Sequence, residues 1–291
     1  MFMWTMPALS LLAALTMSAM PQVTVADGQT YSSSAPITTP PDRNGVFVIK
    51  GTVSDLTIGP VAVAGPYRAI ESATDSIANN LNVTGFTASD IQRDGIRLRN
   101  ANNTMISDFR ITMRETPQSG TNLPQGIALY AGDGIAVRDG NVSGFRMDSV
   151  PGKYPNGDGV AAERAVTNLT IERVTSSNNS DAGFDLKSSG TVLNDLVAED
   201  NHRGFRLWGS ARAGTLTSNN SRSAAFWFGQ GASVTIEHVN VTSHTSAPVF
   251  MIEGASSVIV NSCTLNVPAG TKLVVGADSA AQVTLGSGCE V

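Results

Sequence analysis

The side chains of this sequence that could perform chemistry gather in one stretch, residues 156–210, although only 15% of the 291 residues are charged. The stretch contains the acids Asp158, Glu163, Asp181 and Asp185, the bases Lys187, Arg203 and Arg206, and also His202 and Trp208. Carboxylates mixed with cations suit proton transfer, binding of an anionic substrate or coordination of a hard metal ion. The alternative is a polar face that only keeps the protein in solution.

Three copies of one sequence unit must position these side chains. Each copy opens with a glycine and an apolar–x–apolar triplet, and the glycines, Gly159, Gly183 and Gly204, lie 24 and 21 residues apart. A repeat of about 20–25 residues with a short strand in each unit is typical of a solenoid. The repeat therefore predicts an all-β fold: a single-stranded right-handed parallel β-helix of about nine to ten turns, which forms one domain over residues 27–291.

The stacking of the turns predicts which side chains share a face. Equivalent residues of successive turns lie about 4.8 Å apart, and side chains alternate between the interior and the surface. The residues expected inside are Val160, Phe184, Phe205 and Leu207. One outward column is expected to contain Ala161, Asp185 and Arg206, and the next Glu163, Lys187 and Trp208.

The same alternation predicts outward aromatic rings at Tyr130, Trp208, Phe226 and Phe228. Exposed rings along a groove suit stacking against sugar rings. At least one ring of the consecutive run 226–228 must face outward in any register. The longer connections at residues 116–124 and 147–155 are expected to line the binding face. Residues 67–80 are more polar, which predicts a short helix or a loop.

The composition limits the classes of partner and the cellular compartment that we expect for this protein. The net charge is −5, and the absence of a basic stripe with interleaved aromatic residues argues against a nucleic-acid partner. Residues 1–26 carry no charged side chain, and their apolar run at 7–19 is shorter than the roughly 20 residues of a membrane span. We therefore predict a signal peptide over residues 1–26, cleaved after Ala19 or Ala26, and a secreted or periplasmic monomer without a membrane span after processing.

The two cysteines, Cys263 and Cys289, lie about one repeat apart near the C-terminus. In an oxidising compartment they can form a disulfide, and otherwise they are two buried thiols.

The segments NGDGVAAE, SDAGFDLKS and HRGFRLWGS resemble the core of the pectate lyases of polysaccharide lyase family nine, within the pectin-lyase-like β-helix superfamily. The corresponding family segments run approximately N-A-D-G-F-A-A-K, D-D-G-W-D-L and G-F-K-L-G-G. A weaker likeness runs to the polygalacturonases. The resemblance is confined to residues 156–210.

The resemblance implies a calcium ion bound by Asp158, Asp181 and Asp185, although a further family aspartate falls at Ala182. The catalytic lysine of the family falls at Arg206, and its lysine after the Ala-Ala pair falls at Glu163. Because calcium takes six to eight oxygen ligands, the missing carboxylate weakens the implied site.

The residues also support a reaction directly. A uronate polymer is cleaved by β-elimination when a base removes the proton next to the carboxylate while a cation stabilises the developing charge. The candidate catalytic residues are Arg206, Lys187 and His202, and the candidate residues for binding an acidic polysaccharide are Tyr130, Glu163, Arg203 and Trp208. A Glu163–Lys187 ion pair would favour a binding role for this lysine.

Two alternatives remain. A glycoside hydrolase of the polygalacturonase type needs two carboxyl groups, and Asp158 with Asp181, or Asp181 with Asp185, would supply them. A β-helix that only binds glycans, or that is purely structural, needs no such pair. The sequence favours the lyase, with the other two as alternatives.

Overall fold

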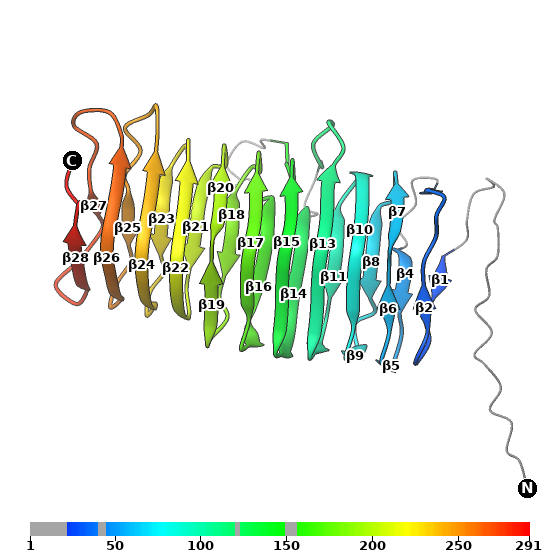
Figure 1. Cartoon of the computed structure of the whole chain (residues 1–291). Coiled ribbons are helices and arrows are strands. Elements are labelled where there is room, and N and C mark those ends of the chain that lie inside the picture. Colours follow the sequence, from blue (N-terminus) through cyan, green and yellow to red (C-terminus); the bar gives the residue numbers. More distant parts are fainter. Residues whose placement is uncertain (1–21, 40–44, 120–122, 149–155) are drawn as a thin grey trace, which may run out of the picture.

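The computed structural model describes residues 22–39, 45–119, 123–148 and 156–291. Over these residues the chain is a right-handed parallel β-helix of about ten turns that contains no α-helix, as the repeat predicted (Figure 1). No helix in the described ranges is long and apolar enough to cross a membrane. Most of the predicted signal peptide, residues 1–21, and parts of the two predicted binding-face loops lie outside the described residues.

The first sheet has 11 strands, one from each turn, stacked parallel along the solenoid. In spatial order these strands are β1 (Val23–Thr24), β4 (Gly45–Ile49), β8 (Arg68–Ser72), β11 (Asp94–Leu98), β14 (Gln125–Asp133), β16 (Asp158–Thr167), β18 (Ala182–Leu186), β21 (Arg203–Leu207), β23 (Ala224–Phe228), β25 (Phe250–Ile252) and β27 (Val274–Val275). Strand β1 lies between the two predicted cleavage points, Ala19 and Ala26, and the signal peptide stays a prediction.

The second sheet has 14 strands and forms the other wall of the solenoid. Its main path is β2 (Thr30–Tyr31), β6 (Thr57–Ile58), β10 (Asn82–Ile91), β13 (Thr104–Met113), β15 (Ile135–Ser143), β17 (Thr170–Ser177), β19 (Thr191–Asn194), β22 (Ser210–Asn219), β24 (Ser233–Thr242), β26 (Ser257–Asn266) and β28 (Gln282–Ser287). The remaining strands of this sheet are β3 (Ile37–Thr38), β7 (Val61–Ala64) and β20 (Leu196–Glu199). A small third sheet consists of β5 (Thr52–Ser54), β9 (Ile77–Asn79) and β12 (Ala101–Asn102).

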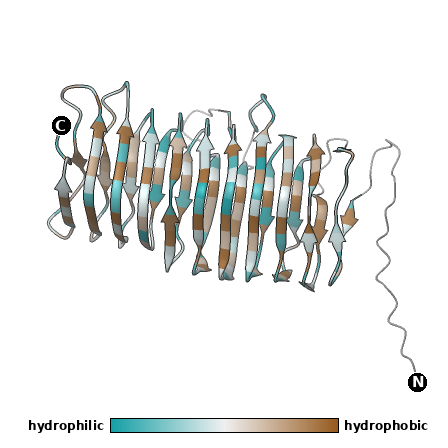
Figure 2. Ribbon diagram, in the orientation of Figure 1, coloured by the Kyte–Doolittle hydropathy of each residue, from teal (hydrophilic) through white to brown (hydrophobic). Residues whose placement is uncertain are grey.

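The hydrophobic core is built from columns of equivalent residues. In one column the rings of Phe184 and Phe205 stack with centroids 5.1 Å apart, and those of Phe205 and Phe226 repeat the same spacing. All three rings are fully buried, as are Val160 and, apart from 2% of its surface, Leu207. The predicted interior positions are therefore confirmed, and hydrophobic and hydrophilic bands alternate along several strands (Figure 2).

The prediction that Phe226 and Phe228 face outward is wrong. Phe226 pairs with Phe205 and Phe228 pairs with Leu207, so both rings are inside and fully buried. Trp227 is the outward residue of this strand and pairs with Arg206. The error has a simple cause: this turn has Ala225 where β11, β14, β16, β18 and β21 have glycine, so the unit begins one residue later than it was counted.

Residues 67–80 form neither a helix nor one loop. They contain β8, a strand of the first sheet, and β9, a strand of the third sheet. Their polar residues belong to a strand because Arg68 and Glu71 form an ion pair of 2.8 Å beside the neighbouring strand β11.

Cys263 and Cys289 form a disulfide, which decides between the two predicted states. It joins β26 to the residues that follow β28, so it fastens the last turn of the solenoid to the turn before it. The end of a solenoid has a neighbour on one side only, and a covalent link compensates for the missing contacts.

The phenylalanine stack provides a test of the fold. Phe205→Ala is expected to lower the free energy of unfolding by about 3–5 kcal/mol, because the change leaves a cavity between two buried rings. Urea unfolding would measure this. Val192→Ala is the matched control: Val192 is 40% exposed, and its loss is expected to change stability by no more than about 0.5 kcal/mol. Equal effects of the two substitutions would contradict the register described above.

Candidate active site

The register of the first sheet brings the predicted site residues onto its outer face. Asp185 pairs with Ala161 on one side and with Arg206 on the other, and Arg206 pairs with Trp227. These four residues, contributed by β16, β18, β21 and β23, are called the arginine column below. The outward column predicted from the repeat is therefore confirmed and extends by one indole.

A second outward column lies beside it, two residues further along each strand. The amide of Lys187 donates to the carbonyl oxygen of Ala162, and the amide of Trp208 donates to that of Leu186, both at 2.8 Å. These bonds place Glu163, Lys187 and Trp208 in one row, which Tyr130 continues onto β14, where Leu129 pairs with Ala162. The four residues Tyr130, Glu163, Lys187 and Trp208 are called the lysine column.

A buried asparagine ladder holds the turns that lead into these strands. The side-chain amide of Asn179 donates to Oδ1 of Asn201 at 2.9 Å, and the amide nitrogen of Asn201 donates to the carbonyl oxygen of Ser176, also at 2.9 Å. Both asparagines are fully buried. Because every polar atom in such a position needs a partner, the ladder fixes the backbone just before β18 and β21.

The repeated glycine follows from the same close packing. A Cβ atom on Gly204 would lie 2.5 Å from both the carbonyl oxygen of Ala225 and Oγ of Ser218. No side chain fits at this distance, so the glycine lets β21 approach the second sheet. It thereby fixes the position of the β21 backbone, from which the side chains of Arg203 and Arg206 project.

Asp181 is the centre of the ionic network. It is fully buried, and its two carboxylate oxygens accept hydrogen bonds from two arginines, Arg203 Nη1 at 2.7 Å and Arg206 Nη1 at 3.0 Å. Charge-assisted bonds of this kind are among the strongest in proteins. Arg203 is 5% exposed, so its position favours anchoring of Asp181 over the direct substrate contact that the sequence suggested.

Asp185 connects the two columns. Its Oδ1 accepts a hydrogen bond from Nε1 of Trp208 at 2.8 Å, and its Oδ2 lies 3.5 Å from Nη1 of Arg206 and 3.9 Å from Nζ of Lys187. Lys187 Nζ also donates to Oε1 of Glu163 at 2.8 Å. The Glu163–Lys187 contact that the sequence analysis considered is therefore present.

Two indoles flank the guanidinium of Arg206. Its Cζ atom lies 5.1 Å from the ring centroid of Trp208 and 5.5 Å from that of Trp227, while Cζ of Arg203 lies 4.2 Å from Trp227. Arginine over an indole is a favourable cation–π arrangement. Trp227 was not among the predicted site residues. The run of three aromatic residues showed that one of them faces outward, but not which one.

A glycine makes room for one of these indoles. A Cβ atom on Gly229 would lie 1.8 Å from Cε3 of Trp208, so the ring occupies the space that a side chain would fill. The indole is thereby held against Arg206 and Asp185.

The electrostatic environment shifts the pKa values of two carboxyl groups. Burial raises the pKa of Asp181 to about 7, although the Arg206 guanidinium opposes the shift. Burial, together with the charges of Asp185 and Asp181, raises the pKa of Asp158 well above its usual value. Oδ1 of Asp158 accepts a hydrogen bond from the Ala182 amide at 3.1 Å. The negative charge of Asp181 thus favours the protonated form of Asp158.

The basic groups are also shifted. Burial and the nearby charge of Arg206 lower the pKa of Arg203 to about 10. Burial, Arg222 and Arg206 lower the pKa of His202, which favours its neutral imidazole. A neutral imidazole can accept a proton, whereas its protonated form cannot.

The three aspartates do not fit the calcium site that the family resemblance implies. Both oxygens of Asp181 face arginines, and Asp185 is engaged by Trp208 and Arg206. Within the described ranges, no group of three or more His, Cys, Asp or Glu side chains is arranged to hold a metal ion. Calcium binding therefore stays a prediction, and the charge that a cation would supply comes here from the two arginines.

Tyr130 lies apart from this network. Its ring is covered by two other arginines, with Cζ of Arg99 at 4.4 Å and Cζ of Arg97 at 5.3 Å from the centroid. Its neighbour in the lysine column is Glu163, next to a register shift between β14 and β16.

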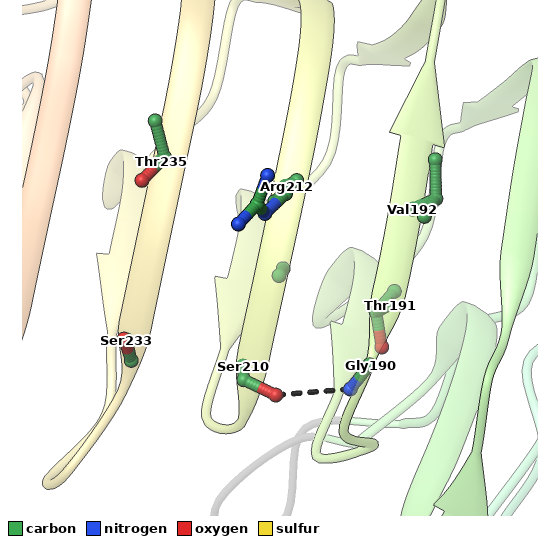
Figure 3. A pocket seen from close by; sticks show the side chains of 8 residues that line it. Gly190, Thr191, Val192, Ser210, Arg212, Ser233 and Thr235 are labelled. Carbon is green, nitrogen blue, oxygen red and sulfur yellow. Dashed lines mark hydrogen bonds between the residues drawn. The ribbon is translucent and has the colours of Figure 1, made fainter.

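A shallow cavity of about 420 Å³ lies over β19, β22 and β24 of the second sheet (Figure 3). It is lined by Gly190, Thr191, Val192, Ser210, Ala211, Arg212, Ser233 and Thr235. Arg212 is its only charged lining residue, and the amide of Gly190 donates to Oγ of Ser210 at 2.9 Å (Figure 3). Without a carboxyl group or a second cation, it lacks the acid–base groups that the outer face of the first sheet provides.

The profile of the family described as right-handed beta helix region matches residues 42–265. Among solved structures, alginate lyase from Paenibacillus sp. str. FPU-7 is similar with a TM-score of 0.59 and 12% identity, over 91% of this chain and 99% of that chain. Endo-xylogalacturonan hydrolase from Aspergillus tubingensis is similar with a TM-score of 0.44 and 11% identity, over 92% and 91% of the two chains.

The catalytic unit of the thermostable GH87 alpha-1,3-glucanase from Streptomyces thermodiastaticus strain HF3-3 has a TM-score of 0.46 and 14% identity, over 91% of this chain and 66% of that chain. No curated protein matches the sequence. At these identities the likenesses concern the fold alone, a right-handed parallel β-helix, and they do not single out the family-nine pectate lyases.

The raised pKa of Asp158 predicts a pH-dependent stability difference. A carboxyl whose pKa is higher in the folded state than in the unfolded state opposes folding once the pH rises above the unfolded value, near 4. Asp158→Asn removes the charge and keeps the Oδ1 acceptor. The melting temperature of the variant relative to the native protein is therefore expected to increase as the pH is raised from about 4 to 8.

Thermal melts across this pH range would measure the difference. Asp108→Asn, which removes one negative charge at an exposed position, is the control. A difference between Asp158→Asn and the native protein that stays constant with pH would show that folding does not raise the pKa of Asp158.

Proposed function

We propose a function from the premise that this chain belongs to the right-handed β-helix family: it cleaves an acidic, uronate-containing polysaccharide by β-elimination. The observation that carries the proposal is Arg206 on the outer face, anchored by Asp181 and Asp185 and flanked by two indoles. Both ion pairs of Arg206 with the described residues use Nη1, so the N–H groups on Nη2 remain for a ligand, whereas Nε is buried.

The reaction requires a fixed cation. Removal of the proton next to the sugar carboxylate places charge on that carboxylate, after which a carbon–carbon double bond forms and the 4-linked oxygen leaves. A guanidinium in a defined orientation stabilises this charge through paired hydrogen bonds. Its two ion pairs hold Arg206 as a clamp for the reacting carboxylate. An arginine whose intrinsic pKa exceeds about 12 is a poor base, so the proton goes to another group.

Lys187 and His202 divide the proton transfers. The ammonium group of Lys187 pairs with Glu163 and lies near Asp185, beside the arginine column, where it can donate a proton to the leaving oxygen. The imidazole of His202, whose pKa is lowered by burial, Arg222 and Arg206, accepts the proton from the sugar. Trp208 and Tyr130 offer aromatic surface for sugar rings, and Glu163 orients Lys187.

The compartment follows from the disulfide and the predicted signal peptide. Disulfides persist in oxidising surroundings, and Cys263 and Cys289 are joined. We therefore propose a secreted or periplasmic protein that meets its polysaccharide outside the cytoplasm, and we expect it to act as a monomer.

A glycoside hydrolase is the second candidate, and the carboxyl groups favour it over a purely structural role. Asp158 and Asp181 have raised pKa values, as a general acid requires. Both are almost completely buried, however, and Asp181 is held by two arginines. The products distinguish the candidates: elimination gives an unsaturated sugar that absorbs ultraviolet light, hydrolysis gives only reducing ends, and a binding protein gives neither.

The central test is substitution of Arg206. Arg206→Ala is expected to lower kcat by about 100-fold or more, within the range of 10²–10⁴ for a group that acts in the transition state, with a smaller effect on KM. Arg206→Lys is expected to fail as well, because lysine lacks the planar fork of a clamp. Ultraviolet absorbance during incubation with polygalacturonate, polymannuronate and polyguluronate would measure the turnover.

The matched control is Arg212→Ala, which removes an exposed arginine from the opposite wall and is expected to leave kcat unchanged. Melting temperatures would separate lost function from lost structure. Full activity in folded Arg206→Ala would refute the assignment of the clamp, and higher activity in Arg206→Lys would make residue 206 the base.

The lowered pKa of His202 predicts the acid side of the pH profile. Because only the neutral imidazole accepts a proton, kcat is expected to fall as the pH drops through the His202 pKa, below its ordinary value near 6.5. His202→Asn is expected to abolish most of the activity and also this acid limb, the fall of kcat at low pH. Lys187→Gln is expected to lower kcat but to keep the acid limb. His244→Asn, at an exposed loop position, is the control. An unchanged acid limb in His202→Asn would transfer the role of base to Lys187.

A further inference from the structure

We propose that the polysaccharide lies along the lysine column and that two arginines form a second carboxylate-binding subsite over Tyr130: Arg99, which continues the lysine column past the end of β11, and Arg97, which pairs with Ala128 in the neighbouring column. The inference rests on the proposed function and extends it, because it defines the path of the substrate and its minimum length. It concerns residues several strands away from Arg206, which the reaction itself does not use.

The first step is the arrangement of the two arginines. Arg97 and Arg99 are both partly exposed, and their guanidinium groups lie 5.3 and 4.4 Å from the ring centroid of Tyr130. The aromatic ring holds both cations at one place through cation–π attraction without using their N–H donors. A site for a planar anion needs such oriented donors.

The second step is the number of donors that are not engaged. A guanidinium has five N–H groups. Arg99 makes no side-chain hydrogen bond or ion pair with the described residues, and Arg97 makes one long contact, 3.4 Å to Oε1 of Glu71. Nε of each arginine is buried, so the donors that remain for a ligand are on the Nη1 and Nη2 atoms, and two such neighbouring groups suit a carboxylate.

The third step is the local charge. Two carboxylates lie nearby, Glu71 and Asp94, and Arg68 already pairs with both, at 2.8 and 2.7 Å. Arg93 adds a further positive charge 3.7 Å from Asp94. Four arginines therefore face two acids, and the surplus of positive charge falls on Arg97 and Arg99, where it attracts an anion.

The fourth step is the continuity of the lysine column. From Arg99 through Tyr130, Glu163 and Lys187 to Trp208, every side chain is partly exposed. The five residues come from successive turns, so the column spans roughly 19 Å at about 4.8 Å per strand. An aromatic ring stands near each end, and both rings can cover the apolar face of a sugar.

The neighbouring arginine column is closed over the same stretch. At β14 and β16 it contains Ala128 and Ala161, which are only 1% and 5% exposed. A ligand that touches both Arg206 and Arg99 therefore follows the lysine column. A polymer with repeated carboxylates satisfies both arginine sites at once, whereas a short fragment reaches only one of them.

The test compares long and short substrates. Arg99→Gln is expected to raise KM, or the Kd for binding, about tenfold for polygalacturonate or alginate chains, as loss of one charge-assisted contact would do. The values for short oligouronides turned over at Arg206 are expected to stay unchanged, and kcat is expected to stay within about twofold. Arg212→Gln, on the opposite wall, is the matched control, and Arg97→Gln repeats the test with the neighbouring arginine.

Binding is measured by affinity electrophoresis and calorimetry as well as by turnover, so that the inference and the proposed function fail separately. If Arg99→Gln and Arg97→Gln bind the long chains as tightly as the native protein while Arg206→Ala loses turnover, the second subsite is refuted and the lyase stands. If no polymer is cleaved but the two variants bind it more weakly, the subsite stands and the lyase is refuted. Equal weakening for short and long chains, or for methyl-esterified chains without charge, would also overturn the subsite.

Discussion

The structure depends on one constraint: each residue of the first sheet lies opposite its equivalent in the next turn, at the spacing of hydrogen-bonded parallel strands. Whatever a position contains is therefore repeated as a column. Inside, this brings Phe184, Phe205 and Phe226 into one stack with centroids 5.1 Å apart. Outside, it places Asp185 beside Arg206. Because one turn has an acid and the next a base at this position, the two side chains form an ion pair.

The same constraint explains why a buried carboxylate is tolerated. Asp181 has lost its contact with water, and an unpaired charge in that position would be strongly unfavourable. Two arginines from the next strand compensate, and they are held in turn by the indole of Trp227 and by the turn that the Asn179–Asn201 bond fixes. The hydrogen bonds and ion pairs of Asp181 with the two arginines offset the free-energy cost of burying these charges. The side chains that make these bonds have little freedom to move. Such rigidity is what a site that must orient a substrate requires.

This network also changes the chemistry expected of the face. Three aspartates alone would suit a hard metal ion, but the arginines and Trp208 occupy their oxygens. The positive charge of this face is thus carried by the side chains of Arg203 and Arg206. The titration of Asp181, whose pKa is raised to about 7, then makes the field at Arg206 dependent on pH near neutrality, since protonation removes the negative charge that Arg206 faces.

The sequence by itself determined the solenoid, because a glycine recurs at the same position of five successive turns, from Gly95 to Gly204, and apolar residues alternate around it. It also determined the columns of Asp185 with Arg206 and of Glu163 with Lys187, since stacking follows directly from the repeat. It failed at Phe226 and Phe228, where Ala225 replaces the marker glycine and alternation can be counted in two ways. Only the tertiary structure decided that Trp227 faces outward, that Asp181 is buried between two arginines, and that Arg97 and Arg99 meet over Tyr130. The reason is physical: a repeat fixes which strands are neighbours, whereas the direction of a long side chain and the degree of burial of a charge depend on every residue packed around it.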